Sequence, residues 1–306
     1  MRTSPLWPID SWQKGFEQIR NWGYEHVELA ANGPHIGEKI DLTDLGNAQI
    51  QVVIKQARSA GLEVSAFQVH QGYQVDNPGE LHVQVVHTKR MIDAAAAGNV
   101  GLVHVVTGSK PPLPDLPAIS ELPGKADSTK QAMSDQSYWQ AMRDVFVDLL
   151  DYAKHRQVTL GIEQVFIFAV CNRQTLRHFF QMVGRDDLYW NCDPAHFVFH
   201  EEPFQDAIQE FGHRIVNAHV KDARIYDDPD GEAAGTVDEM PRKRRFEFVA
   251  PGTGRVDQLE FVKLLHQVGF DGTLVVELPV QMPDRQNVAR DSASLVRQLI
   301  EQVQGA

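Results

Sequence analysis

Hydrophobic and polar positions along the chain follow a unit that repeats. Stretches with apolar residues every three or four positions end at or near a glycine, and short apolar runs rich in β-branched residues follow them. The first pattern is typical of amphipathic helices and the second of buried strands. The predicted helices are 11–22, 47–60, 81–97, 137–156, 173–183, 203–211, 257–268 and 288–303. The predicted strands are 26–31, 63–70, 101–108, 159–165, 188–193, 215–221 and 273–277.

Two of these helices carry a capping box, in which the N-cap side chain and a side chain three residues later each bond to backbone N–H groups. Ser137 with Gln140 predicts one helix start, and Asp257 with Glu260 predicts another. The Pro-Gly-Thr-Gly sequence at 251–254 follows no predicted strand. We therefore interpret it as a loop turn before a helix.

The alternation of strands and helices predicts a parallel sheet, because each crossover returns the chain to the same end of the sheet. Strands that are apolar nearly throughout predict burial on both faces. A closed barrel and an open doubly wound sheet both fit. Eight predicted helices and 306 residues favour the barrel, and no strand is followed by Gly-x-Gly-x-x-Gly. We predict an α/β fold, a (β/α)8 TIM barrel formed by residues 1–306 as a single domain.

Three segments depart from this rhythm. Residues 1–8 contain two prolines and few β-branched residues, so the first strand is predicted to be short or missing. Counting that strand, long loops follow strands 4 and 7. The first is 108–136, rich in Pro, Ser and Asp, and the second is 223–256, with added Gly. Both lie on the face where such barrels build active sites, so they are interpreted either as lids or as disordered segments.

Composition narrows the class of protein. The chain has no run of about 18 apolar residues, so no membrane span is expected, and its start does not resemble a secretion signal. Two cysteines, Cys171 and Cys192, fit a reducing cytoplasm better than a disulfide scaffold. A formal net charge of −12 opposes binding to nucleic acid. The basic run at 242–245 is interpreted as a solvated loop.

Candidate chemistry gathers at the ends of the last four predicted strands. Glu163, Asp193, His219 and Glu277 are spaced by 30, 26 and 58 residues. The first two spacings match one strand–helix unit, and the third is one unit plus the second long loop. Neighbouring strands of a closed barrel bring such ends together. Three carboxylates and an imidazole suit Mn²⁺ or Mg²⁺ better than structural zinc. A glutamate at a strand end is more often half of a salt bridge, but four consecutive strand ends favour a metal site.

The order of motifs resembles the xylose isomerase-like barrels, which include sugar phosphate isomerases and epimerases. The matching sequences are Gly-Ile-Glu at 161–163, Asp-Pro-Ala-His at 193–196, Ala-His-Val-Lys-Asp at 218–222, Pro-Gly-Thr-Gly-Arg-Val-Asp at 251–257 and Gly-Phe-Asp-Gly-Thr-Leu-Val-Val-Glu at 269–277. Residues 23–29 resemble the family's second strand. The likeness spans nearly the whole chain. Members catalyse different reactions, so the fold does not fix the substrate.

The resemblance implies roles for individual residues. Glu163, Asp193, His219 and Glu277 match the metal ligands, and the two glutamates match the acid/base pair of the ketose epimerases. His196 matches a histidine that contacts a substrate hydroxyl. Three further candidates for substrate recognition come from strand ends or from just beyond one: His70, Glu28 and Arg224. Lys221 has the strand parity of His219, so it is expected either to stabilise an enolate or carboxylate, or to form a salt bridge to Asp222 or another acid.

The implied function is a divalent-metal-dependent isomerase or epimerase of sugars or keto-sugars, working through an enediolate. Mn²⁺ is the favoured ion, with Mg²⁺, Co²⁺ and Zn²⁺ as alternatives. The expected substrate is a small sugar or polyol derivative, and a homo-oligomer or a hetero-complex is compatible with the sequence. Elimination from a keto-inositol or a 3-keto-glycoside by a lyase or dehydratase is an alternative. A non-catalytic barrel subunit is a second one. A DNA-repair endonuclease is disfavoured by the acidic chain and by the absence of histidines between His219 and His266.

Overall fold

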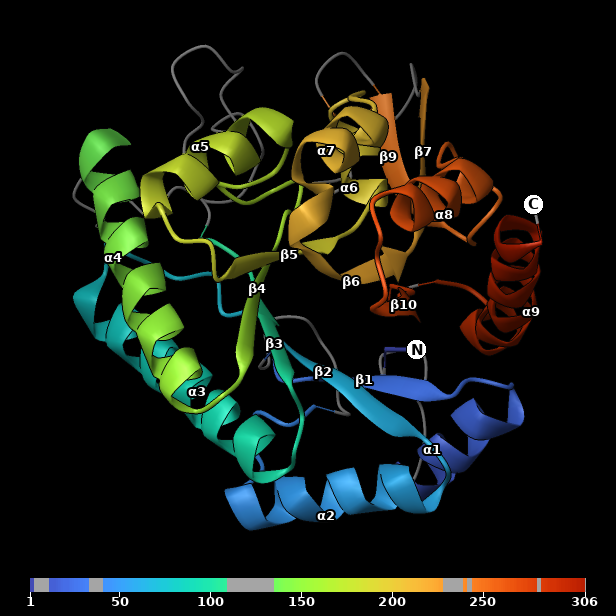
Figure 1. Ribbon diagram of the computed structural model, residues 1–306, viewed down its shortest axis with the longest axis horizontal. Helices are drawn as coiled ribbons and strands as arrows, with labels where there is room; N and C mark the ends of the chain where they lie inside the picture. Colours follow the sequence, from blue (N-terminus) through green and yellow to red (C-terminus); the bar gives the residue numbers. More distant parts are fainter. Residues whose placement is uncertain are drawn as a thin grey trace.

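The computed structural model describes residues 1–2, 11–32, 41–108, 135–227, 239–240, 244–279 and 282–305. Seven parallel strands form a nearly closed barrel in the order β1-β2-β3-β4-β5-β6-β10 (Figure 1). Their bounds are β1 His26–Ala30, β2 Glu63–Val69, β3 Leu102–Val105, β4 Thr159–Glu163, β5 Leu188–Cys192, β6 Ile215–Val220 and β10 Thr273–Val276. The predicted TIM-barrel class is confirmed.

The first two residues lie where an eighth strand would join β10 to β1. The backbone N–H of Arg2 donates to Val276 O at 3.1 Å, and the N–H of Glu28 donates to Met1 O at 2.9 Å. Arg2 and Glu28 form an isolated parallel bridge. Figure 1 shows the N-terminus between β1 and β10. Residues 3–8 of the predicted short strand lie outside the described residues, so the structure places only its beginning.

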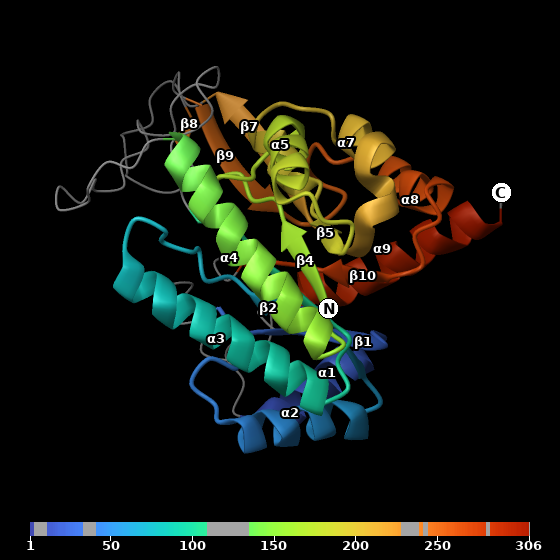
Figure 2. The same cartoon turned by 60° about the vertical axis from the view of Figure 1, so that its left-hand side comes forward.

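Helices surround the barrel, and α3 and α4 pack side by side along one flank (Figure 2). Their bounds are α1 Trp12–Asn21, α2 Asn47–Ser59, α3 Pro78–Ala97, α4 Asp135–His155, α5 Arg173–Val183, α6 Ala195–Phe199, α7 Phe204–Phe211, α8 Gln258–Gln267 and α9 Arg285–Gln304. A 3₁₀ turn, Gly212–Arg214, precedes β6. None of the described helices is long and apolar enough to cross a membrane.

The two predicted capping boxes have different outcomes. The Asp257 side chain accepts the N–H of Glu260 at 2.9 Å and begins α8, which confirms the predicted helix start and the Asp257 half of the box. The prediction at Ser137 is wrong, because α4 already begins at Asp135 and Ser137 lies inside it. The short helix α6 and the 3₁₀ turn were not predicted, since each is too short for a helical period to show.

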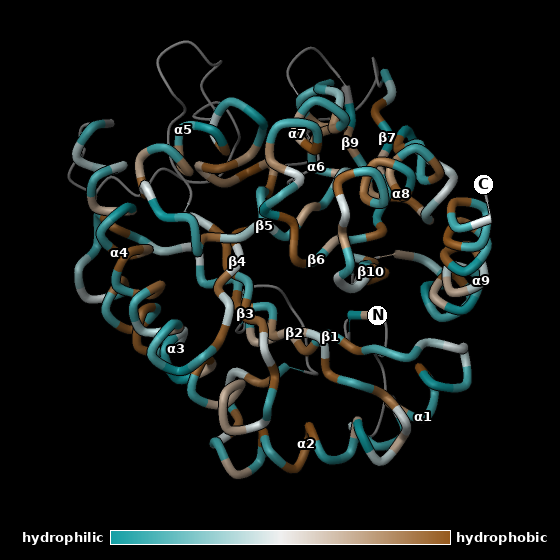
Figure 3. Tube along the Cα trace, viewed as in Figure 1, coloured by the Kyte–Doolittle hydropathy of each residue, from teal (hydrophilic) through white to brown (hydrophobic). Residues whose placement is uncertain are grey.

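Buried apolar side chains form one cluster between the barrel and the helices. Hydrophobic segments lie along β3, β4 and β6, and the outer helices alternate hydrophobic and hydrophilic positions (Figure 3). All four residues of β3 are buried, as expected for a strand covered on both faces. The polar side chains buried inside the barrel therefore sit in a medium where unpaired charge is costly.

The second long segment is not a plain loop. It contains β7 Asp222–Asp227, β8 Glu239–Met240 and β9 Arg244–Val249, which form an antiparallel sheet in the order β7-β9-β8. The basic run therefore belongs in part to a strand, because Arg244 and Arg245 lie in β9. The predicted loop is corrected here. Most of the first long segment, 109–134, lies outside the described residues.

The turn at 251–254 leads into α8, as predicted, and Asp222 holds it in place. Both Asp222 carboxylate oxygens accept backbone N–H groups, from Gly252 at 3.0 Å, Gly254 at 2.8 Å and Val256 at 3.0 Å. A Cβ on Gly254 would lie 2.3 Å from Asp222 Oδ1, so only glycine fits this approach. Gly252 has φ of +85°, which glycine adopts without strain.

Candidate metal centre

The four predicted ligands lie on neighbouring strands of the barrel. Glu163 ends β4, Asp193 directly follows β5, His219 lies within β6, and Glu277 directly follows β10. Because β4, β5, β6 and β10 are consecutive in the sheet, their carboxyl ends meet at the same place. The pairing of these short strands fixes their register, and the alternation of side chains directs these residues inward.

The four side chains come close enough together to hold one ion. One ligand atom from each lies within 4.8 Å of those from the other three. His219 Nδ1 is 2.6 Å from Glu277 Oε2, 3.4 Å from Glu163 Oε1 and 3.6 Å from Asp193 Oδ2. The exposed fraction of these residues is between 0% and 4%.

Each of the four residues has one buried polar atom without a hydrogen-bond partner. These atoms are Glu163 Oε1, Asp193 Oδ2, His219 Nδ1 and Glu277 Oε2. They are the atoms that face one another across the cluster. A buried polar atom without a partner costs roughly 1–3 kcal/mol, and more if it is charged. One cation among these four atoms would satisfy all of them, so the residues present fit a divalent ion.

Two basic side chains reach the rim of the cluster. Lys221 Nζ lies 3.3 Å from Glu277 Oε1 and 3.4 Å from Asp193 Oδ2. Arg2 forms a buried ion pair with Glu277 Oε1. Burial lowers the pKa of Lys221, but the carboxylates of Glu277 and Asp193 outweigh burial and raise that pKa above its ordinary value. Lys221 is therefore an ammonium ion.

The net charge of the cluster is negative, which favours binding of a divalent cation. The described residues contribute the carboxylates of Glu28, Glu163, Asp193 and Glu277 and the cations of Arg2 and Lys221. The acids exceed Arg2 and Lys221 by two charges. Burial lowers the pKa of His219, but the carboxylates of Glu163, Glu28 and Glu277 outweigh burial and raise that pKa well above its ordinary value. A divalent ion bound among these groups would take the place of the imidazole proton and offset the two excess negative charges. Burial raises the pKa of Glu163, yet His219 and His70 outweigh burial and hold that pKa well below its ordinary value, so this carboxylate is ionised.

The structure brings several predicted substrate contacts to the same place. His196 Nε2 lies 3.4 Å from Asp193 Oδ2 and 3.5 Å from Glu163 Oε1. His70 Nε2 lies 3.1 Å from Glu163 Oε2. Lys221 pairs with Glu277 and Asp193, and not with Asp222, which holds the turn before α8 instead. Lys221 therefore points into the barrel, as predicted from its strand parity with His219. Its role stays a prediction.

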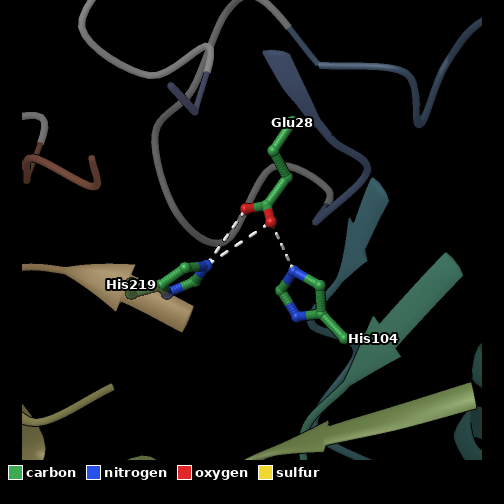
Figure 4. A group of neighbouring side chains, drawn as sticks. All are labelled: Glu28, His104 and His219. Atoms are coloured by element: carbon green, nitrogen blue, oxygen red, sulfur yellow. Dashed lines mark hydrogen bonds and ion pairs between the residues drawn. The ribbon is translucent and has the colours of Figure 1, made fainter. Parts of the chain in front are cut away.

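The other two predicted contacts lie differently. Arg224 projects from β7, its side chain is 55% exposed, and it pairs with Glu247 of β9. Its ion-pair partner therefore belongs to the second sheet and not to the ligand cluster. Glu28 is fully buried and faces two imidazoles, His104 of β3 and His219 of β6 (Figure 4).

Several residues of the site were missed by sequence reasoning. They are Arg2, His104, Asn191, Asn217, Phe166 and Phe248. Strand parity was a usable signal for two of them, because Asn191 lies two residues before Asp193 and Asn217 two before His219. His104 also lies within a predicted strand, but nothing there distinguished it from a structural histidine.

An aromatic wall flanks the cluster on the side of the second sheet. The Phe248 ring centroid lies 4.2 Å from Lys221 Nζ, and its ring meets the edge of His196 at 5.5 Å. Phe166 stacks on His196, also at 5.5 Å. The second long segment thus contributes a side chain to the site by forming β9.

Comparisons with known proteins agree with this architecture. The chain belongs to the xylose isomerase-like TIM barrel family, whose model matches residues 16–299. An inosose dehydratase from Serratia proteamaculans (strain 568) is 28% identical over 153 residues, covering 48% of this chain and 50% of that protein. The match therefore spans about half the length of this curated relative.

Two solved structures show the same fold at low sequence identity. One is a xylose isomerase-like TIM barrel protein from Mycobacterium smegmatis in complex with magnesium. Its TM-score is 0.70 at 16% identity, covering 95% of this chain and 89% of that one. The other is an L-ribulose 3-epimerase, with a TM-score of 0.70 at 14% identity and coverage of 99% and 94%. The chain is thus similar to barrels described as an epimerase, a dehydratase and a magnesium complex.

Proposed function

We propose that this chain is a divalent-metal-dependent isomerase or epimerase of sugars or keto-sugars, in which Glu163 and Glu277 move a proton next to a carbonyl. The observation that carries the proposal is the convergence of four buried atoms without hydrogen-bond partners, one each from Glu163, Asp193, His219 and Glu277. Three oxygens and one nitrogen favour Mn²⁺, with Mg²⁺, Co²⁺ and Zn²⁺ as alternatives.

A divalent ion bound there would polarise a carbonyl and acidify the neighbouring C–H. The protein residues perform the proton transfers. Glu163 ends β4 and Glu277 directly follows β10, and β5 and β6 lie between these two strands in the sheet, so we place their carboxylates on different sides of the substrate. One carboxylate takes the proton from carbon. The other, after it has accepted a proton from water, returns that proton to the opposite face for epimerisation. Return to the neighbouring carbon gives isomerisation.

The basic groups stabilise the charge that develops on the substrate oxygen. Lys221 is a buried ammonium ion beside both Asp193 and Glu277, so it can donate a hydrogen bond to an enediolate oxygen. Burial raises the pKa of Glu277, but Lys221 and Arg2 outweigh burial and hold that pKa well below its ordinary value. His196 and His70 lie close enough to contact hydroxyl groups of a bound sugar.

Elimination is the second candidate, and the sequence relative favours it, because that protein is an inosose dehydratase. The same carboxylate would remove the α-proton from a keto-inositol or 3-keto-glycoside. Lys221 or His196 would then protonate the β-oxygen as its C–O bond breaks, releasing water or an alcohol. Both reactions use the same first step and differ in what happens to the enolate.

Incubation of the Mn²⁺-loaded protein in D₂O with a panel of ketoses, keto-inositols and 3-keto-glycosides tests the proposal. Deuterium at the carbon next to the carbonyl, detected by NMR or mass spectrometry, is the expected result. The product then separates epimerisation, isomerisation and elimination. Conversion in which the hydrogen remains protium and moves directly between carbons would show a hydride shift and contradict the role given to the glutamates.

A further inference from the structure

The His219 ring has a different environment on each of its nitrogens. Nδ1 faces the ligand cluster, 2.6 Å from Glu277 Oε2. Nε2 faces Glu28, 3.3 Å from Oε1 and 3.4 Å from Oε2. Figure 4 shows the Glu28 carboxylate between the rings of His219 and His104. Glu28 belongs to β1, His104 to β3 and His219 to β6, so three strands bring these groups together.

Glu28 carries a carboxylate where no water reaches it, since Glu28, His104 and His219 are each 0% exposed. Such a charge needs hydrogen-bond donors. His104 Nε2 lies 2.9 Å from Oε2, and Asn217 Nδ2 donates to the same oxygen at 2.9 Å. Oε1 has no hydrogen-bond partner of good geometry. Its ion-pair contact is His219 Nε2, which is the donor this oxygen requires.

Asn191 also lies near His219 Nε2, with its Nδ2 at 3.2 Å. Its two amide hydrogens have other acceptors: Glu163 Oε2 at 2.9 Å and His104 Nδ1 at 3.4 Å. His104 can accept there because its own proton lies on Nε2, toward Glu28. A proton on His219 Nε2 can therefore point to Glu28, and the network then has a consistent set of donors and acceptors.

We propose that Glu28 is a positioning residue for the metal centre, which fixes the tautomer and the orientation of the His219 ring. With the proton held on Nε2 by Glu28, the Nδ1 lone pair faces the other three ligands. This inference rests on the proposed metal-dependent function and assigns Glu28 to the support of a ligand instead of to hydroxyl recognition. Loss of such a support typically weakens metal affinity by roughly 10–100-fold.

The Glu28→Gln variant tests this role. Three donors converge on Glu28, and an amide would present N–H groups to some of them. We expect Mn²⁺ affinity, measured by titration calorimetry, to fall by about 10–100-fold. The absorption bands of the Co²⁺-loaded variant are expected to shift, because the geometry of His219 changes. If Glu28→Gln does not fold, Glu28→Asp takes its place, because it keeps the charge but is one methylene shorter. Its Mn²⁺ affinity and Co²⁺ absorption bands are compared with those of the wild type in the same way.

Thr88→Val is the matched control. Thr88 is fully buried on α3, and its hydroxyl pairs with Tyr73 Oη at 2.9 Å, away from the ligand cluster. This variant loses a buried hydrogen bond and is expected to keep the Mn²⁺ affinity and Co²⁺ spectrum of the wild type. An equal loss of affinity in Thr88→Val and Glu28→Gln would reduce the effect to general destabilisation and overturn the inference.

The remaining outcomes separate the two proposals. If the wild type binds Mn²⁺ and Glu28→Gln binds it equally well with an unchanged Co²⁺ spectrum, the role of Glu28 is overturned and the metal-dependent function stands. If the wild type binds neither Mn²⁺ nor Co²⁺, both are overturned.

Discussion

The two ends of the barrel differ in how their carboxylates are placed. A cavity of about 620 Å³ opens at the N-terminal ends of β1 and β10, between α8 and α9. Its lining includes Tyr24, Leu265, Phe270 and Ile300. The carboxylates there, Glu25 and Asp271, are exposed to water. At the other end, the carboxylates are buried and face one another.

A cavity by itself therefore does not mark a chemical site in this protein. None of the residues lining the N-terminal cavity has a buried side-chain polar atom without a hydrogen-bond partner, whereas each of the four candidate ligands has one. An exposed carboxylate is stabilised by water, and a buried one requires a cation or donors. The convergence of these atoms is therefore the reason for proposing that end of the barrel as the reactive one.

Removal of the metal is expected to have the largest effect. Chelation should abolish the activity, and added Mn²⁺ should restore it. Saturation at about 100 times the dissociation constant should stabilise the folded protein by about 2.7 kcal/mol. Calorimetric scans with and without Mn²⁺ measure the corresponding rise in Tm. His219→Ala should show no Mn²⁺-dependent rise, and a rise equal to that of the wild type would place the ion elsewhere.

Replacing one glutamate at each end of the barrel tests whether only the buried carboxylates take part in the reaction. Glu163→Gln or Glu277→Gln keeps the shape and one oxygen ligand but removes the base, so the rate should fall by roughly 10²–10⁴. Glu25→Gln, at the N-terminal end, should leave the rate unchanged within about twofold, as expected of a surface change. Metal content must be measured on the same samples, because metal loss would imitate loss of the base. Full activity in a metal-loaded Glu163→Gln would contradict its role.

A substitution in the aromatic wall is expected to have a smaller effect on kcat/KM. Phe248→Leu keeps an apolar side chain but removes the ring face next to Lys221 Nζ, an interaction worth about 1 kcal/mol, or roughly fivefold in kcat/KM. Phe180→Leu is the matched control, since its ring lies 4.8 Å from the guanidinium carbon of Arg214, outside the site. It should leave kcat/KM unchanged. Equal losses of kcat/KM in both variants would show that Phe248 has no particular role in the site.

The smallest effect on the site is expected from a substitution in the N-terminal cavity. Leu265 is 2% exposed and lines that cavity. Leu265→Ala should lower the free energy of unfolding by about 2–4 kcal/mol, because buried contacts are lost. Mn²⁺ affinity should remain that of the wild type. Denaturant titration and calorimetry measure these two quantities, and a tenfold change in affinity would show that the two ends are coupled.

The sequence predicted the barrel because its strands and helices are regular enough for their periods to show. The helix Arg173–Val183 was predicted with the bounds that the structure has. The positions of the four ligand candidates were also predictable, since consecutive parallel strands bring their ends together whatever their connections. Residues 223–256 were misread because their Pro and Gly content suggested a loop, although Phe246 and Phe248 alternate with charged neighbours as in a strand.

The contacts that the sequence could not reveal depend on closure of the barrel. Arg2 meets Glu277 across 275 positions of sequence, and only the pairing of the chain start with β10 brings them together. Glu28 was predicted to recognise a hydroxyl because it lies near a strand tip. Its full burial and its two imidazole neighbours follow from the packing of three strands, which no local pattern encodes.

The most direct test of the central claim is the position of the ion itself. Crystals grown with Mn²⁺ and measured for anomalous scattering should show one peak per chain among Glu163 Oε1, Asp193 Oδ2, His219 Nδ1 and Glu277 Oε2. Each ligand distance should be about 2.0–2.2 Å, as for comparable divalent ions. Well-ordered crystals with no peak among these four atoms, or with a peak bound by other residues, would contradict the account.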